Sequence, residues 1–63
     1  MDKDIGLADA VRKACLEAAL ESYEQAGMSG LCEEGRWECA ADAIRSLDLG
    51  AVVTQFNKRN GSD

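Results

Sequence analysis

The chain has 63 residues, enough for one small domain. A chain of this length buries only about 60% of the surface that its unfolded form exposes, so a solitary monomer would be marginally stable. It has 12 acidic and 7 basic residues, a formal net charge of −5 and no histidine. This balance disfavours nonspecific binding to nucleic acid or to anionic membranes, which depends on clusters of lysine and arginine. It does not exclude a local basic face.

The composition favours helix throughout. Alanine, glutamate and leucine are abundant, there is no proline, and aromatic residues make up only 5% of the chain. No stretch is long and apolar enough to span a bilayer, and the first residues lack the pattern of a signal peptide. Three cysteines without a secretory context are typical of reduced thiols in a cytosolic protein. We therefore expect an all-α protein in the cytoplasm, with no membrane partner.

Residues 1–6 are polar and predict a flexible N-terminus, with Asp4 as the N-cap of the first helix. A helix is predicted over 7–26, because apolar side chains recur there at spacings of three and four and would share one face. That face comprises Ala8, Val11, Cys15, Ala18, Ala19, Tyr23 and Ala26, widened by Leu16 and Leu20. Charged residues gather on the opposite side, so the apolar face needs another surface to cover it.

Two glycines separate this helix from the next. Gly27 is predicted to be the left-handed residue that ends the first helix, and Ser29 the N-cap of the second. The second helix is predicted over 31–47, and the short loop would turn it back along the first. Its apolar face comprises Cys32, Cys39, Ala40, Ala43, Ile44 and Leu47, with Trp37 on the flank. The chain therefore predicts an antiparallel helical hairpin.

A third apolar stripe lies beyond the hairpin and comprises Leu49, Val52, Val53 and Phe56. On one straight helix this stripe would lie nearly opposite Ala43 and Leu47, and the helix would have to bury both of its sides. We therefore predict a break near 47–50 and a short third helix capped by Asp48. Residues 57–63 are polar and predict a disordered tail, which leaves 7–56 as a single helical-hairpin domain.

The side chains that usually carry catalysis are scarce. There is no histidine, and no serine or cysteine has an evident activating partner, so we expect no enzymatic activity. Three scattered cysteines do not have the spacing of a zinc site, and we expect no metal and no cofactor. Cys15, Cys32 and Cys39 are predicted to be small core residues. The alternative is a redox-sensing thiol at Cys32, where a helix N-terminus would favour the thiolate.

One group of charges on the second helix has the pattern of a solvated edge. Glu34, Glu38 and Asp42 step by four along it. Like charges at this spacing repel slightly and are ordinarily exposed. A basic protein partner for this acidic face is the alternative.

A second group lies beside the apolar face: Glu33 and Arg36, next to Trp37. We expect the two charges to form a structural ion pair across the seam, within the hairpin or between subunits, because charges near an apolar seam need partners. They could instead extend past the seam to water, with Arg36 lying along Trp37. A ligand site is the third alternative.

The hinge and the start of the second helix carry a resemblance. The stretch 26–38, Ala-Gly-Met-Ser-Gly-Leu-Cys-Glu-Glu-Gly-Arg-Trp-Glu, is similar to a motif of short, uncharacterised bacterial proteins that are grouped with the Rop-like family. The resemblance covers about 7–48 and includes the chain length. It implies a homodimer in which two hairpins form a four-helix bundle. Rop itself binds paired RNA loops through its first helix, but Arg12 and Lys13 are the only cations predicted there, so no RNA-contact residue is carried over.

These observations predict a small cytosolic interaction module, a homodimeric regulator or adaptor without catalytic activity. A Rop-like RNA-binding regulator and a thiol-based redox sensor are the alternatives. The residues expected at the interface or in the core are Val11, Cys15, Ala19, Tyr23, Cys32, Glu33, Arg36, Trp37, Cys39, Ala40, Ala43, Ile44 and Leu47.

Overall fold

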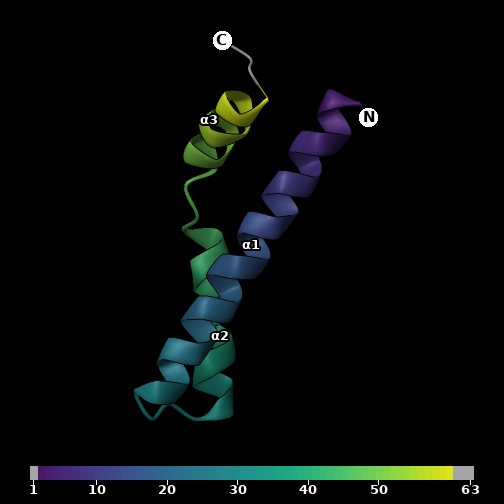
Figure 1. Cartoon of the computed structure of the whole chain (residues 1–63). Helices are drawn as coiled ribbons and strands as arrows, with labels where there is room; N and C mark the ends of the chain where they lie inside the picture. The colour runs from purple at the N-terminus through teal and green to yellow at the C-terminus, as the bar shows by residue number, and fades with distance from the viewer. Residues whose placement is uncertain (1, 61–63) are drawn as a thin grey trace. The chain divides into compact units, whose positions relative to one another are not determined.

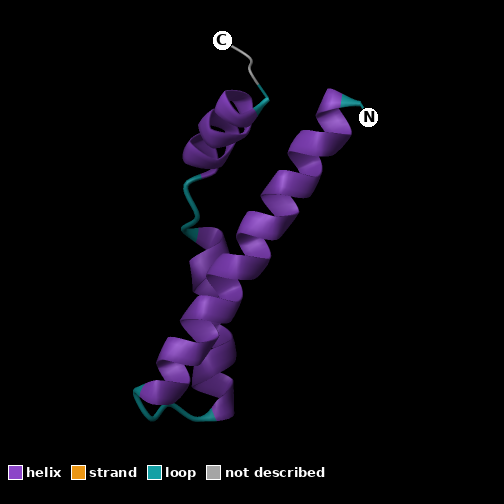
Figure 2. Ribbon diagram, viewed as in Figure 1, coloured by secondary structure: helices purple, strands orange, loops and turns teal. Residues whose placement is uncertain are grey.

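The structure, a computed structural model, describes residues 2–60. This part of the chain contains three helices and no strands. Figure 2 shows how the helices alternate with loops along the chain. The helices are α1 (Lys3–Met28), α2 (Glu33–Arg45) and α3 (Leu49–Arg59). The prediction of an all-α fold is confirmed.

The described residues form two compact units. One is Cys15–Leu47, and the other consists of the described parts of Met1–Ala14 and Asp48–Asp63. α1 therefore contributes its first part to one unit and the remainder to the other. No helix within residues 2–60 is both long and apolar enough to cross a membrane.

α1 begins at Lys3, four residues before the predicted start. The Oδ1 atom of Asp2 accepts a hydrogen bond of 3.2 Å from the backbone N–H of Asp4. The Asp2 carbonyl accepts another, of 3.0 Å, from the N–H of Gly6. Asp2 therefore caps the helix in place of Asp4. Residues 3–6, expected in a flexible N-terminus, are helical, and Met1 lies outside the described residues.

α1 ends at a different glycine from the predicted one. Gly30 has a φ of 89°, and it is the one residue with positive φ in the part of the chain that the structure describes. The N–H of Leu31 bonds to the carbonyl of Ala26, and the N–H of Gly30 to the carbonyl of Gly27, both at 3.0 Å. This pair of bonds defines a Schellman motif with Gly30 as its left-handed residue. Gly27, predicted to end α1, lies inside it.

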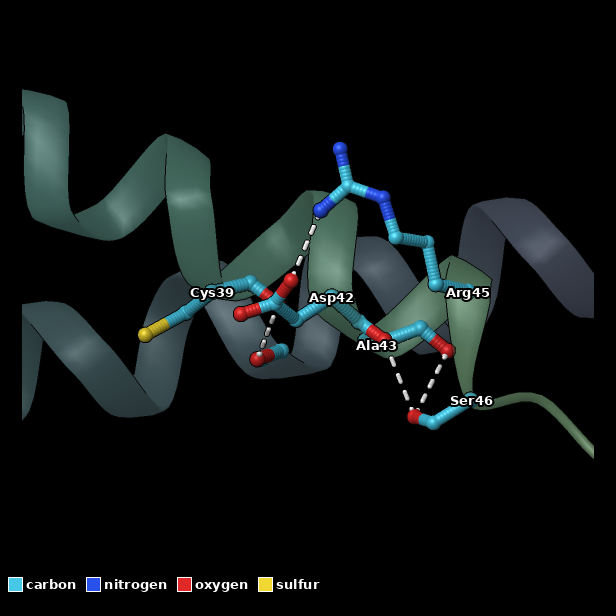
Figure 3. Close-up of polar contacts among 6 residues, drawn as sticks. Cys39, Asp42, Ala43, Arg45 and Ser46 are labelled. Carbon is cyan, nitrogen blue, oxygen red and sulfur yellow. Dashed lines mark hydrogen bonds and ion pairs between the residues drawn. The ribbon is translucent and has the colours of Figure 1, made fainter.

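α2 begins at Glu33, and its N-cap residue is Cys32, whose side chain makes no capping hydrogen bond. The prediction of Ser29 as this cap is wrong, because the Schellman loop shifts the helix start beyond it. Glu33 and Glu34 in the first turn compensate, since carboxylates are favoured at the positive end of a helix dipole. At the other end the Ser46 hydroxyl donates to the carbonyl of Asp42 at 2.9 Å, as Figure 3 shows.

The predicted break before the third helix is confirmed. α2 ends at Arg45 and α3 begins at Leu49. The Oδ1 atom of Asp48 accepts a hydrogen bond of 3.0 Å from the backbone N–H of Ala51, so Asp48 is the N-cap, as predicted. α3 continues to Arg59, and residues 57–59, which we expected in a disordered tail, are helical. Asn60 is the C-cap of α3, and residues 61–63 of the predicted tail lie outside the described residues.

In the unit Cys15–Leu47, α2 runs antiparallel to α1 beyond a short loop, as predicted (Figure 1). The Ser22 hydroxyl donates a hydrogen bond of 3.0 Å to the backbone carbonyl of Cys39. A serine reaches the backbone of the facing helix only where the two helices approach closely. Ala26 and Ala40, exposed by 6% and 4%, are the two apolar residues buried within the described range. The seam is narrow and made of small side chains.

In the second unit, α3 packs on the first part of α1. A Cβ atom at Gly6 would lie 3.3 Å from the Cζ atom of Phe56, so the ring lies directly against the α1 backbone. Val52, Val53 and Phe56 are half-buried, whereas Leu49 is 51% exposed. The apolar stripe predicted on α3 therefore faces α1, and its Phe56 ring covers Gly6.

Gly30→Ala is expected to destabilise the protein by about 1–2 kcal/mol, because a Cβ atom clashes with the backbone in the left-handed region. Urea denaturation at fixed protein concentration measures this loss. Ser29→Ala is the matched control and should be nearly neutral, because Ser29 does not cap α2. A loss of about 1 kcal/mol at Ser29, the usual cost of removing an N-cap, would contradict the helix boundary.

Candidate functional site

Four side chains from both helices meet near the loop. Tyr23 lies on α1, and Glu33, Arg36 and Trp37 lie on the first turns of α2; together they form what we call the hinge cluster. The rings of Tyr23 and Trp37 are in contact, with centroids 5.1 Å apart and planes tilted by 55°. The centroid distance is within the range of favourable aromatic pairs, and the rings are tilted rather than stacked face to face.

Glu33 accepts hydrogen bonds from both aromatic side chains. The Tyr23 hydroxyl donates to its Oε2 atom at 2.6 Å, and the indole Nε1–H of Trp37 donates to the same oxygen at 3.1 Å. The bond from Tyr23 joins α1 to α2, whereas that from Trp37 stays within α2. The Glu33 carboxylate thus holds the two rings in a fixed relation at the surface, where its own side chain is 64% exposed.

Arg36 is the least exposed charged member, with 31% of its side chain accessible. Its guanidinium carbon lies 4.2 Å from the centre of the Tyr23 ring, and its Nε–H donates to the Tyr23 carbonyl at 3.4 Å. Arginine stacks well on aromatic faces because its planar cation meets the negative face of the ring. The alternative that Arg36 lies along Trp37 is therefore wrong, because Tyr23 provides both a ring and a carbonyl.

The expected ion pair between Glu33 and Arg36 is present but long. The Nη1 atom of Arg36 lies 4.0 Å from Oε1 of Glu33, and both residues belong to α2. The seam is bridged instead through Tyr23, which each of them contacts separately. The two charges therefore tie α2 to its own hairpin, one through the Tyr23 hydroxyl and the other through its ring and carbonyl.

Gly27 has a role that the sequence reasoning missed. A Cβ atom there would lie 2.6 Å from the guanidinium carbon of Arg36 and 2.7 Å from its Nη2 atom. Arg36 can therefore lie across α1 only because position 27 has no side chain. A glycine inside a helix is a local signal for such a close approach, but the sequence offered the competing explanation of a helix end.

The hinge cluster changes the acid–base behaviour of Tyr23. The hydrogen bond to Glu33, and then partial removal from water, raise the pKa of Tyr23 above 10.0, while the positive charge of Arg36 acts in the opposite direction. The cluster contains no histidine or free nucleophile, and no group of three or more metal-binding side chains occurs among residues 2–60. Its two rings and two charges can organise a binding surface.

The ring contact also identifies a second apolar surface. Because Tyr23 and Trp37 touch, the flanks of α1 and α2 that carry them lie on the same side of the hairpin. Leu16 and Leu20 share the Tyr23 flank, at spacings of seven and three residues before it, and Ile44 shares the Trp37 flank, seven residues after it. Because the two helices are antiparallel, the apolar residues of both flanks extend away from the loop along the same side of the hairpin.

This surface, which we call the outer apolar face, consists of Leu16, Leu20, Trp37 and Ile44. The four residues are exposed by 58%, 53%, 62% and 45%, respectively. Ile44 was predicted on the inner face of α2, and the structure places it outside, because the narrow seam accommodates the small side chains of Ala40 and Ala43 instead. Leu47, predicted on the same inner face, is half-buried beyond the end of α2. Several large apolar side chains exposed on one side of two packed helices are typical of an interaction site.

The other predicted residues are divided between the seam, the second unit and the surface. Ala40 is buried, and Ala19, Cys15 and Cys39 are half-buried at the seam side of their helices. Val11 is half-buried in the other unit. Cys32 is exposed, so its prediction as a core residue is wrong, because it precedes the first turn of α2 instead of lying within it.

Comparison with family models, curated proteins and solved structures found no match for this chain. The resemblance to the Rop-like family therefore stays a prediction. What the structure defines is a class: a small acidic all-α chain with a helical hairpin and an outward apolar face.

The Tyr23 phenol should titrate above 10.0 in the folded protein. A raised pKa means that folding favours the neutral phenol, so this stabilisation is fully present below pH 10 and is lost as the pH rises through the native pKa. Phenolate absorbance measures it without overlap, because the chain has one tyrosine. Glu33→Ala should lower the native pKa, whereas Glu34→Ala, which removes a neighbouring carboxylate, should not. Equal responses of the two variants would contradict the Tyr23–Glu33 bond.

Gly27→Ala and Arg36→Ala should be coupled. Alanine is favoured over glycine inside a helix by about 0.5–1 kcal/mol. In the natural chain this gain is offset, because the new Cβ atom displaces the Arg36 guanidinium from Tyr23. With Arg36→Ala already present, the full gain should appear in urea denaturation. A Gly27→Ala effect that agrees within about 0.3 kcal/mol in both backgrounds would show that the two positions are independent.

Proposed function

We propose that the protein is a small interaction module that works as a homodimer, a regulator or adaptor in the cytoplasm without catalytic activity of its own. The outer apolar face is the observation that supports this proposal most directly. Its four large side chains are each between 45% and 62% exposed in the single chain. Removing such side chains from water is the main driving force of protein association.

A second copy fits this face by its pattern. Leu16, Leu20 and Tyr23 on α1 have the i, i+4, i+7 spacing of a coiled-coil seam, and Trp37, Ala41 and Ile44 repeat it on α2. Two such seams on one side of a hairpin can be covered by two more helices, which gives the geometry of a four-helix bundle. The small size of the inner seam adds to this need, because two buried alanines contribute little to stability.

RNA binding as in Rop has less support. α1 carries three basic and five acidic residues, and the Nζ atom of Lys13 lies 3.2 Å from the carboxylate of Asp9. A helix with this balance lacks the cationic surface that binds phosphates. Redox sensing would depend on the single exposed thiol of Cys32. The acidic edge of α2 remains available to a basic protein partner.

Leu20→Glu should convert the dimer into a monomer, because it places a carboxylate at the centre of the outer apolar face. Leucine and glutamate have similar helix propensities, and Leu20 is 53% exposed in the single chain, so helicity should be retained. Sedimentation at micromolar concentration should show twice the chain mass for the natural protein and one chain mass for the variant.

Gln25→Glu is the matched control. It adds the same carboxylate to an exposed position on the same helix, well away from the outer apolar face, and should leave the dimer intact. The midpoint of thermal unfolding of the natural protein should rise with concentration, since assembly is coupled to stability. A monomer with a concentration-independent midpoint would refute the proposed homodimer.

A further inference from the structure

If two copies pack through the outer apolar face, as proposed above, two-fold symmetry allows two arrangements. With the loops at the same end, α1 of one protomer lies on α2 of the other. With the loops at opposite ends, α1 lies on the partner's α1 and α2 on the partner's α2. The charges that border the face distinguish between these arrangements.

On α2 the outer apolar face is bordered by Glu38 and Arg45, which lie on either side of Ala41 along the helix. Both charged residues are exposed. Arg45 makes an ion pair of 2.7 Å with Asp42, shown in Figure 3, in which both side chains are more than 70% exposed. Exposed pairs of this kind are weak, so Arg45 can exchange this partner for another at small cost.

The arrangement with the loops together is disfavoured by like charges. It would bring Glu24, on the edge of α1, to the level of the partner's Glu34 and the partner's Glu38. All three positions are exposed, and the hinge half of the unit Cys15–Leu47 has Arg36 as its sole cation within the described range, already engaged with Tyr23. Carboxylates held opposite one another in this way repel.

We propose that the dimer is antiparallel, with its two-fold axis level with Ala41 and with Glu38 of each protomer paired to the partner's Arg45. A two-fold axis that brings Glu38 beside the partner's Arg45 also brings Arg45 beside the partner's Glu38. The contact is therefore made twice, and the border of the face is complementary to itself. The same axis brings Trp37 to the partner's Ile44. The Ser22–Cys39 and Tyr23–Trp37 contacts place Leu20 level with Ala41, so the axis also brings Leu20 towards the partner's Leu20. Each half of the outer apolar face covers the other half, and the two acidic hinge ends are kept apart.

The test is charge reversal, measured as the dimer dissociation constant by sedimentation equilibrium at low salt. Glu38→Arg and Arg45→Glu should each weaken the dimer by about tenfold, because two symmetry-related contacts change from attraction to repulsion. The double variant, with both reversals in the same chain, should recover most of the natural affinity. Glu21→Arg makes the same charge change on the side of α1 that points away from the outer apolar face. It should leave the dimer dissociation constant nearly unchanged.

Each other outcome overturns the inference. With the loops together, Glu38→Arg would relieve repulsion from the partner's Glu24 and tighten the dimer. If each reversal weakens the dimer and the double variant does not recover affinity, Glu38 is not paired with the partner's Arg45. A natural protein that is monomeric at all concentrations would refute the homodimer itself, whereas a stable dimer with the wrong charge response refutes only its orientation. Helicity measured by circular dichroism confirms that each variant is folded.

Discussion

The narrow seam between α1 and α2 is the constraint on which the rest of the hairpin depends. Ala26 and Ala40 are its buried residues, and the Ser22 hydroxyl reaches across to the backbone of α2. Helices that approach this closely leave little space between them for large apolar side chains. The large apolar side chains are therefore turned to the outside, where Leu16, Leu20, Trp37 and Ile44 form one exposed face. The exposure of these side chains is thus a direct consequence of the small residues at the seam.

The hinge cluster determines how this face is presented. Glu33 binds Tyr23 and Trp37 through one carboxylate oxygen, while Arg36 lies over the Tyr23 ring above Gly27. These contacts join the two helices at the loop end and hold the Trp37 indole in a solvent-exposed position. Charged residues beside an apolar surface here serve to orient an aromatic side chain, and the ion pair between them, at 4.0 Å, is a minor part of the arrangement.

The candidate site was partly predictable. Glu33, Arg36 and Trp37 stood out because two charges beside an apolar stripe need partners, and the structure places them together. Tyr23 was predicted as an apolar residue of α1, and its contact with all three depends on the register of the two helices, which no short-range pattern specifies. The position of the charges also depends on helix register. That Glu38 and Arg45 border the outer apolar face can be recognised only once it is known which side of the hairpin that face occupies.

The sequence by itself determined the all-α class, the hairpin, the break before α3 and the cap at Asp48, because periodicity, breakers and capping residues act over a few neighbouring residues. The tertiary structure decided which glycine ends α1 and which apolar side chains stay outside. Gly27 and Gly30 are equally able to adopt a left-handed conformation, and Gly27 remains helical in the fold in which Arg36 occupies the space above it. Ile44 is exposed because the helices meet along alanines, and that distance is set by packing between residues far apart in the chain.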